Sequence, residues 1–222
     1  MIRDSPFTID LVLSPLNPIV DVDVAARAGW MPLDLLQAYL DGGATFVQIR
    51  AKRFESGALL ELCDAAVVRT QAYKGQIVVN DRVDVARLAG AAGVHVGQDD
   101  LPPLQARELL GPAAIVGVST HTLPQAEAAL EQPVTYVAVG PVFGTRTKDT
   151  GYQAVGLDLV SAVARRNGAL PVVAIGGITI DTAVSVLEAG ATSVAIIGDL
   201  LATGDPAARV ADYLRLLAGH RV

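Results

Sequence analysis

The sequence predicts an α/β protein whose parallel strands close into a single (β/α)8 TIM barrel. Short apolar runs rich in β-branched residues alternate along the chain with longer amphipathic stretches. Runs that are apolar throughout are typical of parallel strands buried on both faces. Eight strand–helix units in 222 residues fit a closed barrel. An open doubly wound sheet is the alternative, because periodicity alone does not reveal closure.

The predicted strands are short and carry mostly Val, Ile and Leu. They cover residues 9–13, 45–49, 76–80, 93–96, 115–119, 136–140, 171–175 and 193–197. Several of the intervening helices begin after Pro, Asp or Thr and end near Gly or Asn, as helix termini commonly do. They cover residues 32–40, 57–68, 84–88, 103–110, 124–130, 157–165, 182–188 and 207–217. No linker divides the chain, so we expect one domain over residues 1–222 with an irregular first loop at about 14–31.

Composition narrows the class of protein further. Hydrophobic residues make up 51% and charged residues 18% of the chain, which excludes an intrinsically disordered protein. The balance of 17 basic and 23 acidic residues gives 17 − 23 = −6, which argues against nucleic-acid binding. The single Cys63 excludes a disulfide framework and a Cys-based zinc cage, and its helical position indicates a core residue.

Two further signals concern location and partners. No apolar run reaches about 18 residues, and the first residues lack the pattern of a secretory signal peptide. We therefore expect a soluble cytoplasmic protein that binds neither nucleic acid nor a membrane. Whether the protein forms a homo-oligomer is left open by the sequence.

Polar residues gather where the predicted strands end, which is where a parallel barrel places its functional loops. Asp81 and Asp100 follow neighbouring strands, and two such carboxylates suit Mg²⁺, which takes further ligands from water and phosphate. The alternative is that these aspartates cap the helices that follow. Arg50, Lys52 and Lys148 could face a diphosphate, or could be ordinary solvated surface charges.

A second anion site is predicted after the last two strands. Gly176 and Gly177 end one strand, and Gly198 ends the next. Glycines allow backbone N–H groups to approach a phosphate, although a tight turn would also explain them. His121 reads as a general acid or base or as a loop residue, whereas His95 between two valines reads as a packed residue.

Seven segments together resemble the thiamine-phosphate synthase family. They are QIRAK (48–52), VNDRVDVA (79–86), GVHVGQDDL (93–101), GVSTHT (117–122), VGPVFGTRTKDT (139–150), AIGGI (174–178) and VAII (194–197). The resemblance implies a Mg²⁺-dependent transferase with a TIM-barrel fold. Such an enzyme joins hydroxymethylpyrimidine diphosphate to a thiazole phosphate by a dissociative substitution, and it releases thiamine phosphate and diphosphate.

The resemblance also implies roles for individual residues. Asp81 and Asp100 would be the Mg²⁺ ligands, and Arg50, Lys52, Ser119 and Lys148 would be catalytic. The substrate-binding residues would be Gln48, Ile49, Arg50, Ala51, Lys52, Asn80, Ser119, Thr145, Arg146, Thr147, Lys148, Gly177, Ile197 and Gly198. Gly198 stands where the family usually has serine, and the expected first strand, LVLSPLNP, departs from the family's usual polar-tipped strand close to Y-x-V-T-D.

Two other functions fit a similar sequence. One is a thiazole tautomerase, an isomerase of the same family that needs neither a diphosphate site nor Mg²⁺. The other is a non-catalytic protein that binds thiazole phosphate or thiamine phosphate. The intact acidic motifs around Asp81 and Asp100, together with Lys148, favour the synthase.

Overall fold

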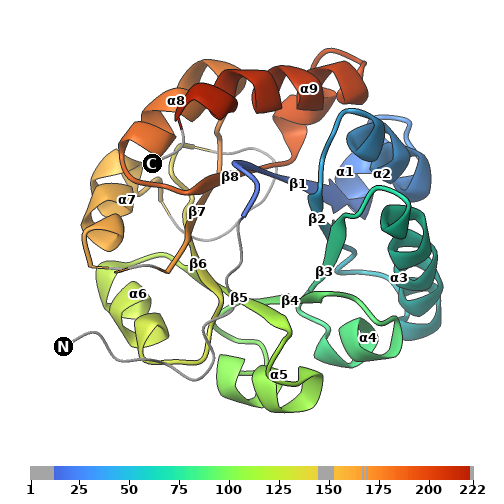
Figure 1. Cartoon of the computed structure of the whole chain (residues 1–222), viewed down its shortest axis with the longest axis horizontal. Coiled ribbons are helices and arrows are strands. Elements are labelled where there is room, and N and C mark those ends of the chain that lie inside the picture. Colours follow the sequence, from blue (N-terminus) through green and yellow to red (C-terminus); the bar gives the residue numbers. More distant parts are fainter. Residues whose placement is uncertain (1–12, 145–152, 167, 169, 221–222) are drawn as a thin grey trace.

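Eight parallel strands form a closed barrel in chain order, surrounded by a ring of helices (Figure 1). The computed structural model describes residues 13–144, 153–166, 168 and 170–220. Closure is completed by β1 (Leu16–Asp21), which pairs with β8 (Ser193–Ile196) as well as with β2 (Phe46–Arg50). The predicted TIM barrel is therefore confirmed, and the open doubly wound sheet is excluded.

The remaining elements alternate as the sequence predicts. The other strands are β3 (Gln76–Asn80), β4 (Gly93–Val96), β5 (Ile115–Thr120), β6 (Tyr136–Val139) and β7 (Val172–Ile175). The helices are α1 (Val22–Arg27), α2 (Pro32–Asp41), α3 (Ser56–Gln71), α4 (Val83–Leu88), α5 (Pro103–Leu110), α6 (Leu123–Leu130), α7 (Gly156–Ala164), α8 (Ile180–Glu188) and α9 (Pro206–Leu217). Two 3₁₀ turns, η1 (Gly198–Leu201) and η2 (Ala218–His220), follow β8 and α9.

The start of the barrel differs from the prediction. The expected strand at 9–13 falls almost wholly outside the described residues, and the expected irregular loop at 14–31 is wrong, because it contains β1 and α1. Pro15 and Pro18 suggested a loop, since proline cannot donate to a strand ladder. In the barrel, β1 pairs with β8 up to Pro18 and with β2 from Ile19 onward. Pro18 lies where the pairing changes from β8 to β2. The strand therefore forms although Pro18 has no N–H to donate.

The interior of the barrel is apolar in its middle and polar at the carboxyl ends of the strands. A buried cluster takes side chains from strands around the barrel, among them Ile19, Phe46, Val78 and Tyr136, so it fills the interior. Successive side chains of a strand alternate between its two faces. Two residues beyond Phe46 and Val78, the same faces therefore carry Gln48 and Asn80. The apolar plug thus supports a layer of polar side chains at the ends of the strands.

Two predictions from composition can be compared with the described residues. Cys63 is fully buried in the core, as predicted, and burial raises the pKa of its thiol to about 12. Among the described helices, none combines the length and the apolar character that crossing a bilayer requires. The cytoplasmic location stays a prediction.

Candidate active site

The loops after β3 and β4 bring Asp81 and Asp100 together. The Asp100 carboxyl group raises the pKa of Asp81 through a side-chain interaction, so the two carboxyl groups lie close to each other. Asp81 has a left-handed backbone conformation, with φ of 63°, and its N–H donates to the His95 carbonyl at 2.7 Å. Asp100 Oδ2 accepts from the N–H of Gly97 at 2.7 Å, which closes the second loop. Neighbouring strands therefore place the two carboxylates as a pair.

The structure decides against the capping alternative for this pair. The residues at the N-caps of α4 and α5 are Arg82 and Pro102, and neither helix has a side-chain cap hydrogen bond. Helix formation thus does not require either carboxylate. Asp81 instead pairs with Lys52, and Asp100 accepts from the N–H of Gly97.

A cation lies beside the acidic pair. Lys52 Nζ is 3.0 Å from Asp81 Oδ2. Burial is the largest cause that raises the pKa of Asp81, and contact with Asp100 raises it further, whereas Lys52 lowers it. Two carboxylates in contact repel each other when both are ionised, so a cation between them would be strongly favoured.

Arg50 is held by a residue that the sequence analysis missed. Its Nη1 donates to Asp21 Oδ2, and the two residues face each other in the β1–β2 register. The Asp21 side chain is only 2% exposed and that of Arg50 13%. Asp21 also accepts from the N–H of Val24 at 3.1 Å and so caps α1. The sequence feature that could have identified Asp21 is its position directly after the apolar pair Ile19–Val20, as expected of a residue at the end of a buried strand.

The Nε atom of Arg50 is left over from this ion pair. It is buried and has no hydrogen-bond partner among the described residues. Buried guanidinium N–H groups are normally satisfied, because an unpaired one costs free energy. An unsatisfied donor at the end of β2 is consistent with an anionic ligand on Arg50.

His95 on β4 connects Ser119 on the neighbouring strand β5 with Tyr136 on β6. Its Nε2 lies 2.8 Å from Ser119 Oγ, and its Nδ1 lies 2.9 Å from the hydroxyl of Tyr136. The histidine ring stacks on that of Tyr136, with centroids 5.6 Å apart. Gly117 makes room for the phenol, because a Cβ there would come 2.1 Å from the Tyr136 ring. His95 is thus buried, as predicted, but it also orients a predicted catalytic serine.

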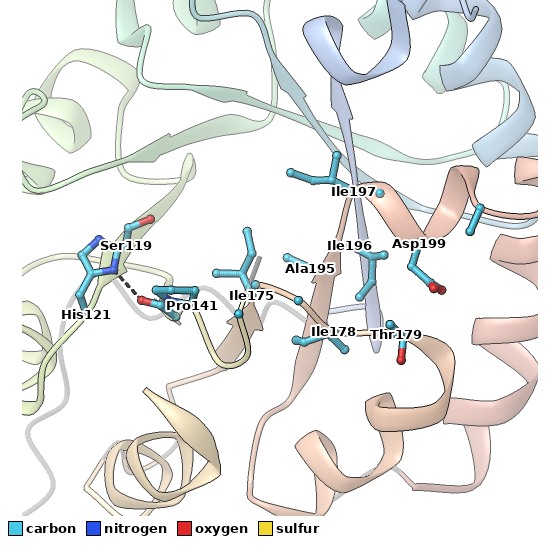
Figure 2. Close-up of a pocket in the computed structure, with 16 residues that line it drawn as sticks. Ser119, His121, Pro141, Ile175, Ile178, Thr179, Ala195, Ile196, Ile197 and Asp199 are labelled. Carbon is cyan, nitrogen blue, oxygen red and sulfur yellow. Dashed lines mark hydrogen bonds between the residues drawn. The ribbon is translucent and has the colours of Figure 1, made fainter. Parts of the chain in front are cut away.

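A pocket of about 360 Å³ opens beside Ser119 (Figure 2). Ser119 and His121 lie on one side, while Thr179 and Asp199 lie on the other. The predicted phosphate residues Gly177, Ile197 and Gly198 also line it. The two predicted sites therefore share a boundary at Ser119.

Glycine is required at two positions of the turn that lines this pocket. Gly176 and Gly177 have φ of 104° and 64°, a region that side chains other than glycine rarely adopt. A Cβ on Gly177 would come 2.5 Å from the Gly144 carbonyl. The glycines are thus needed for a tight turn, and the same turn lines the pocket. The two explanations offered for these glycines, a tight turn and a phosphate site, are therefore compatible.

The remaining predicted residues differ in how they face the site. Gln48 and Asn80 are buried and share the inward strand face with Arg50. Ile49 points outward into the core between barrel and helices, and Ala51 packs against that core, so neither side chain belongs to the inner layer. His121 lies 2.5 Å from the Gly140 carbonyl through Nδ1, and its N–H donates to Gln125. Thr145, Arg146, Thr147 and Lys148 lie outside the described residues.

Known proteins are similar to this chain in both fold and sequence. The chain is 44% identical over 176 residues to the thiamine-phosphate synthase of Roseiflexus castenholzii, covering 79% of this chain and 77% of that protein. It is 38% identical over 200 residues to that of Azorhizobium caulinodans, covering 90% and 91%. The structure matches thiamine phosphate pyrophosphorylase from Pyrococcus furiosus with a TM-score of 0.82 and 29% identity, covering 93% and 96%.

A family model gives the assignment. The model described as thiamine monophosphate synthase matches residues 20–200, which include the carboxyl ends of all eight strands of the barrel and the acidic pair. Sequence identity, coverage and fold agree across these comparisons. The chain therefore belongs to the thiamine monophosphate synthase family.

Proposed function

We propose that this protein joins a hydroxymethylpyrimidine diphosphate to a thiazole phosphate, as a thiamine-phosphate synthase. The observation that carries the proposal is the placement of Asp81 near Asp100 and 3.0 Å from Lys52, which follows the polar end of β2. A dicarboxylate flanked by cations suits a metal-bound diphosphate. The neighbouring pocket, with its glycine turns, suits a second phosphorylated substrate.

The residues present fit Mg²⁺. Asp81 and Asp100 offer two neighbouring carboxylates, and carboxylate oxygen is the donor type that Mg²⁺ prefers. Among the described residues, no group of three or more His, Cys, Asp or Glu could hold a metal ion. The other ligands would come from water and from the substrate diphosphate. When bound, Mg²⁺ would supply positive charge to the departing diphosphate.

The protein's own groups would hold the pyrimidine diphosphate. Arg50 would bind its phosphate oxygens through the guanidinium, oriented by Asp21, and Lys52 would add a second positive charge. Ser119, oriented by His95, would bind the same substrate at the boundary of the two sites. Gln48, Asn80 and Lys148 complete the proposed set.

The second site would bring the thiazole to the reacting carbon. Gly177 and Gly198 would bind its phosphate through their backbones, with Ile197 alongside and Thr145, Arg146 and Thr147 as further proposed contacts. Fixed cations stabilise the negative charge that grows on diphosphate as the C–O bond breaks. The electron-rich aminopyrimidine would stabilise the positive charge left on its methylene carbon. The thiazole nitrogen then forms the new C–N bond, so no protein nucleophile is needed.

One assay distinguishes the proposal from its rivals. The purified protein is incubated with pyrimidine diphosphate, thiazole phosphate and Mg²⁺, and the products are quantified. The proposal predicts thiamine phosphate and diphosphate in equal amounts. Isomerisation of the thiazole without release of diphosphate would show a tautomerase instead, and binding without any product would show a non-catalytic protein.

Tyr136→Phe is expected to lower kcat roughly tenfold, because His95 loses one of the hydrogen bonds that fix its ring and, through it, the Ser119 hydroxyl. Burial raises the pKa of Tyr136, so its hydroxyl stays protonated and is able to donate. The measurement is kcat for this variant, for Ser119→Ala and for the double variant. The losses should be less than additive, since both changes act through one chain of contacts. Independent, fully additive losses would show that Tyr136 does not act through Ser119.

A further inference from the structure

Asp199 belongs to a cluster that the proposed mechanism does not use. Its Oδ2 accepts from Arg209 Nε at 3.1 Å, from Arg209 Nη2 at 2.9 Å and from the Tyr213 hydroxyl at 2.6 Å. The Arg209 guanidinium also lies over the Tyr213 ring, 5.7 Å from its centroid. Asp199 is in η1, and both partners are on α9, so the cluster ties the turn after β8 to the outer helix.

The cluster is largely shielded from water. The side chains of Asp199 and Arg209 are only 13% and 17% exposed, and Tyr213 is fully buried. Both nitrogens of Arg209 that face Asp199 bind the same oxygen. Ion pairs in such surroundings are less screened than surface pairs, so the loss of one partner leaves the other charge strongly felt nearby.

Asp199 also lines the pocket that holds the glycine turns. Gly176, Gly177 and Gly198 line the same pocket, and Asp199 lies across it from Ser119 (Figure 2). An ionised carboxylate in the wall of a pocket for an anion would repel that anion. Arg209 supplies a compensating charge on the side facing α9, so the wall carries no net negative charge.

We propose that Arg209 is a positioning residue for the phosphorylated substrate, acting through Asp199, which it holds and neutralises beside the phosphate pocket. The inference rests on the proposed function of this pocket as the site of the thiazole phosphate. The charge of Arg209 matters in this proposal because it compensates the charge of Asp199. Arg209 itself does not reach the phosphate.

A charge cycle tests this inference. Calorimetry gives the Kd of thiazole phosphate, and kinetics gives KM for each substrate. Arg209→Gln should weaken thiazole phosphate binding about tenfold by exposing the Asp199 charge, with KM for the pyrimidine diphosphate unchanged. The double variant Asp199→Asn/Arg209→Gln should return Kd to within about twofold of the wild type, because no uncompensated carboxylate is left. Arg215→Gln is the matched control, since Arg215 lies on the same helix in an exposed pair with Asp212 and should have no effect.

Three outcomes would overturn the inference alone. They are a double variant as weak as Arg209→Gln, an Arg209→Gln variant with wild-type Kd, and equal losses for both substrates. Melting temperatures of all variants show whether a change in Kd reflects partial unfolding, and the double variant keeps the test decisive if Arg209→Gln alone is unstable. Failure of the proposed function would look different. A wild-type protein that binds thiazole phosphate but makes no thiamine phosphate would refute the proposed function, and the calorimetric cycle would still decide the role of Arg209. A wild-type protein that does not bind thiazole phosphate would overturn both.

Discussion

Replacing Asp81 by asparagine is expected to lower kcat roughly a thousandfold at saturating substrates and Mg²⁺. The variant removes one of the two carboxylates that would hold the metal, and with it the charge that stabilises the departing diphosphate. Asparagine is the suitable replacement, because Asp81 has φ of 63°, a backbone conformation that Asn adopts more readily than most residues. The backbone contact of Asp81 with His95 should therefore survive.

The measurement is kcat as a function of Mg²⁺ concentration, together with the melting temperature. Asp99→Asn is the control, because Asp99 is exposed and adjoins Asp100 in the chain. It should behave like the wild type. An Asp81→Asn variant with the wild-type rate and the wild-type Mg²⁺ dependence would remove the acidic pair from the mechanism.

Asp21→Asn should reduce both stability and turnover. The change leaves Arg50 buried without a counter-charge, which we expect to cost about 2–3 kcal/mol of unfolding free energy and to lower Tm by about 5–10 °C. Asparagine keeps an oxygen that can accept from Val24, so the cap of α1 should survive. Turnover should fall about a hundredfold, because a guanidinium that is no longer held by Asp21 is poorly placed to bind the diphosphate.

Asp23→Asn is the control for this prediction. Asp23 pairs with Arg53 at 2.8 Å in the adjacent turn, but the two side chains are 33% and 75% exposed. Exposed pairs contribute about 0–1 kcal/mol, so this variant should keep nearly the wild-type Tm and kcat. Equal effects of the two substitutions, or a stable Asp21→Asn variant with full turnover, would show that Asp21 does not position Arg50.

The barrel and the acidic pair could be predicted because both depend on local signals. Apolar runs such as 76–80 and 93–96 mark buried parallel strands without any knowledge of their partners. Consecutive strands of a barrel are neighbours in space, so Asp81 and Asp100 are expected to lie close together, and the effect of Asp100 on the pKa of Asp81 agrees with this. Helix boundaries follow from Pro, Asp, Thr and Gly, which act within a turn of the helix end.

The first strand and the role of His95 could not be predicted in this way. Pro15, Asn17 and Pro18 disfavour a strand locally, and the pairing with β8 that stabilises β1 joins residues at opposite ends of the chain. His95 meets Ser119 on the neighbouring strand and Tyr136 on the strand beyond it, 24 and 41 residues away in sequence. A valine–histidine–valine segment gives no sign of such contacts. Because β1 was misplaced, Asp21 was also missed as the partner of Arg50.

The central claim is that Asp81 and Asp100 jointly hold a divalent cation against the departing diphosphate. The most direct test is a crystal structure with Mn²⁺ and diphosphate, in which an anomalous difference map locates the metal. We expect one anomalous peak, from a metal ion coordinated by an oxygen of each carboxylate and by diphosphate oxygens. Arg50 and Lys52 should contact the same diphosphate. A diphosphate bound elsewhere, or a metal that touches neither aspartate, would contradict it.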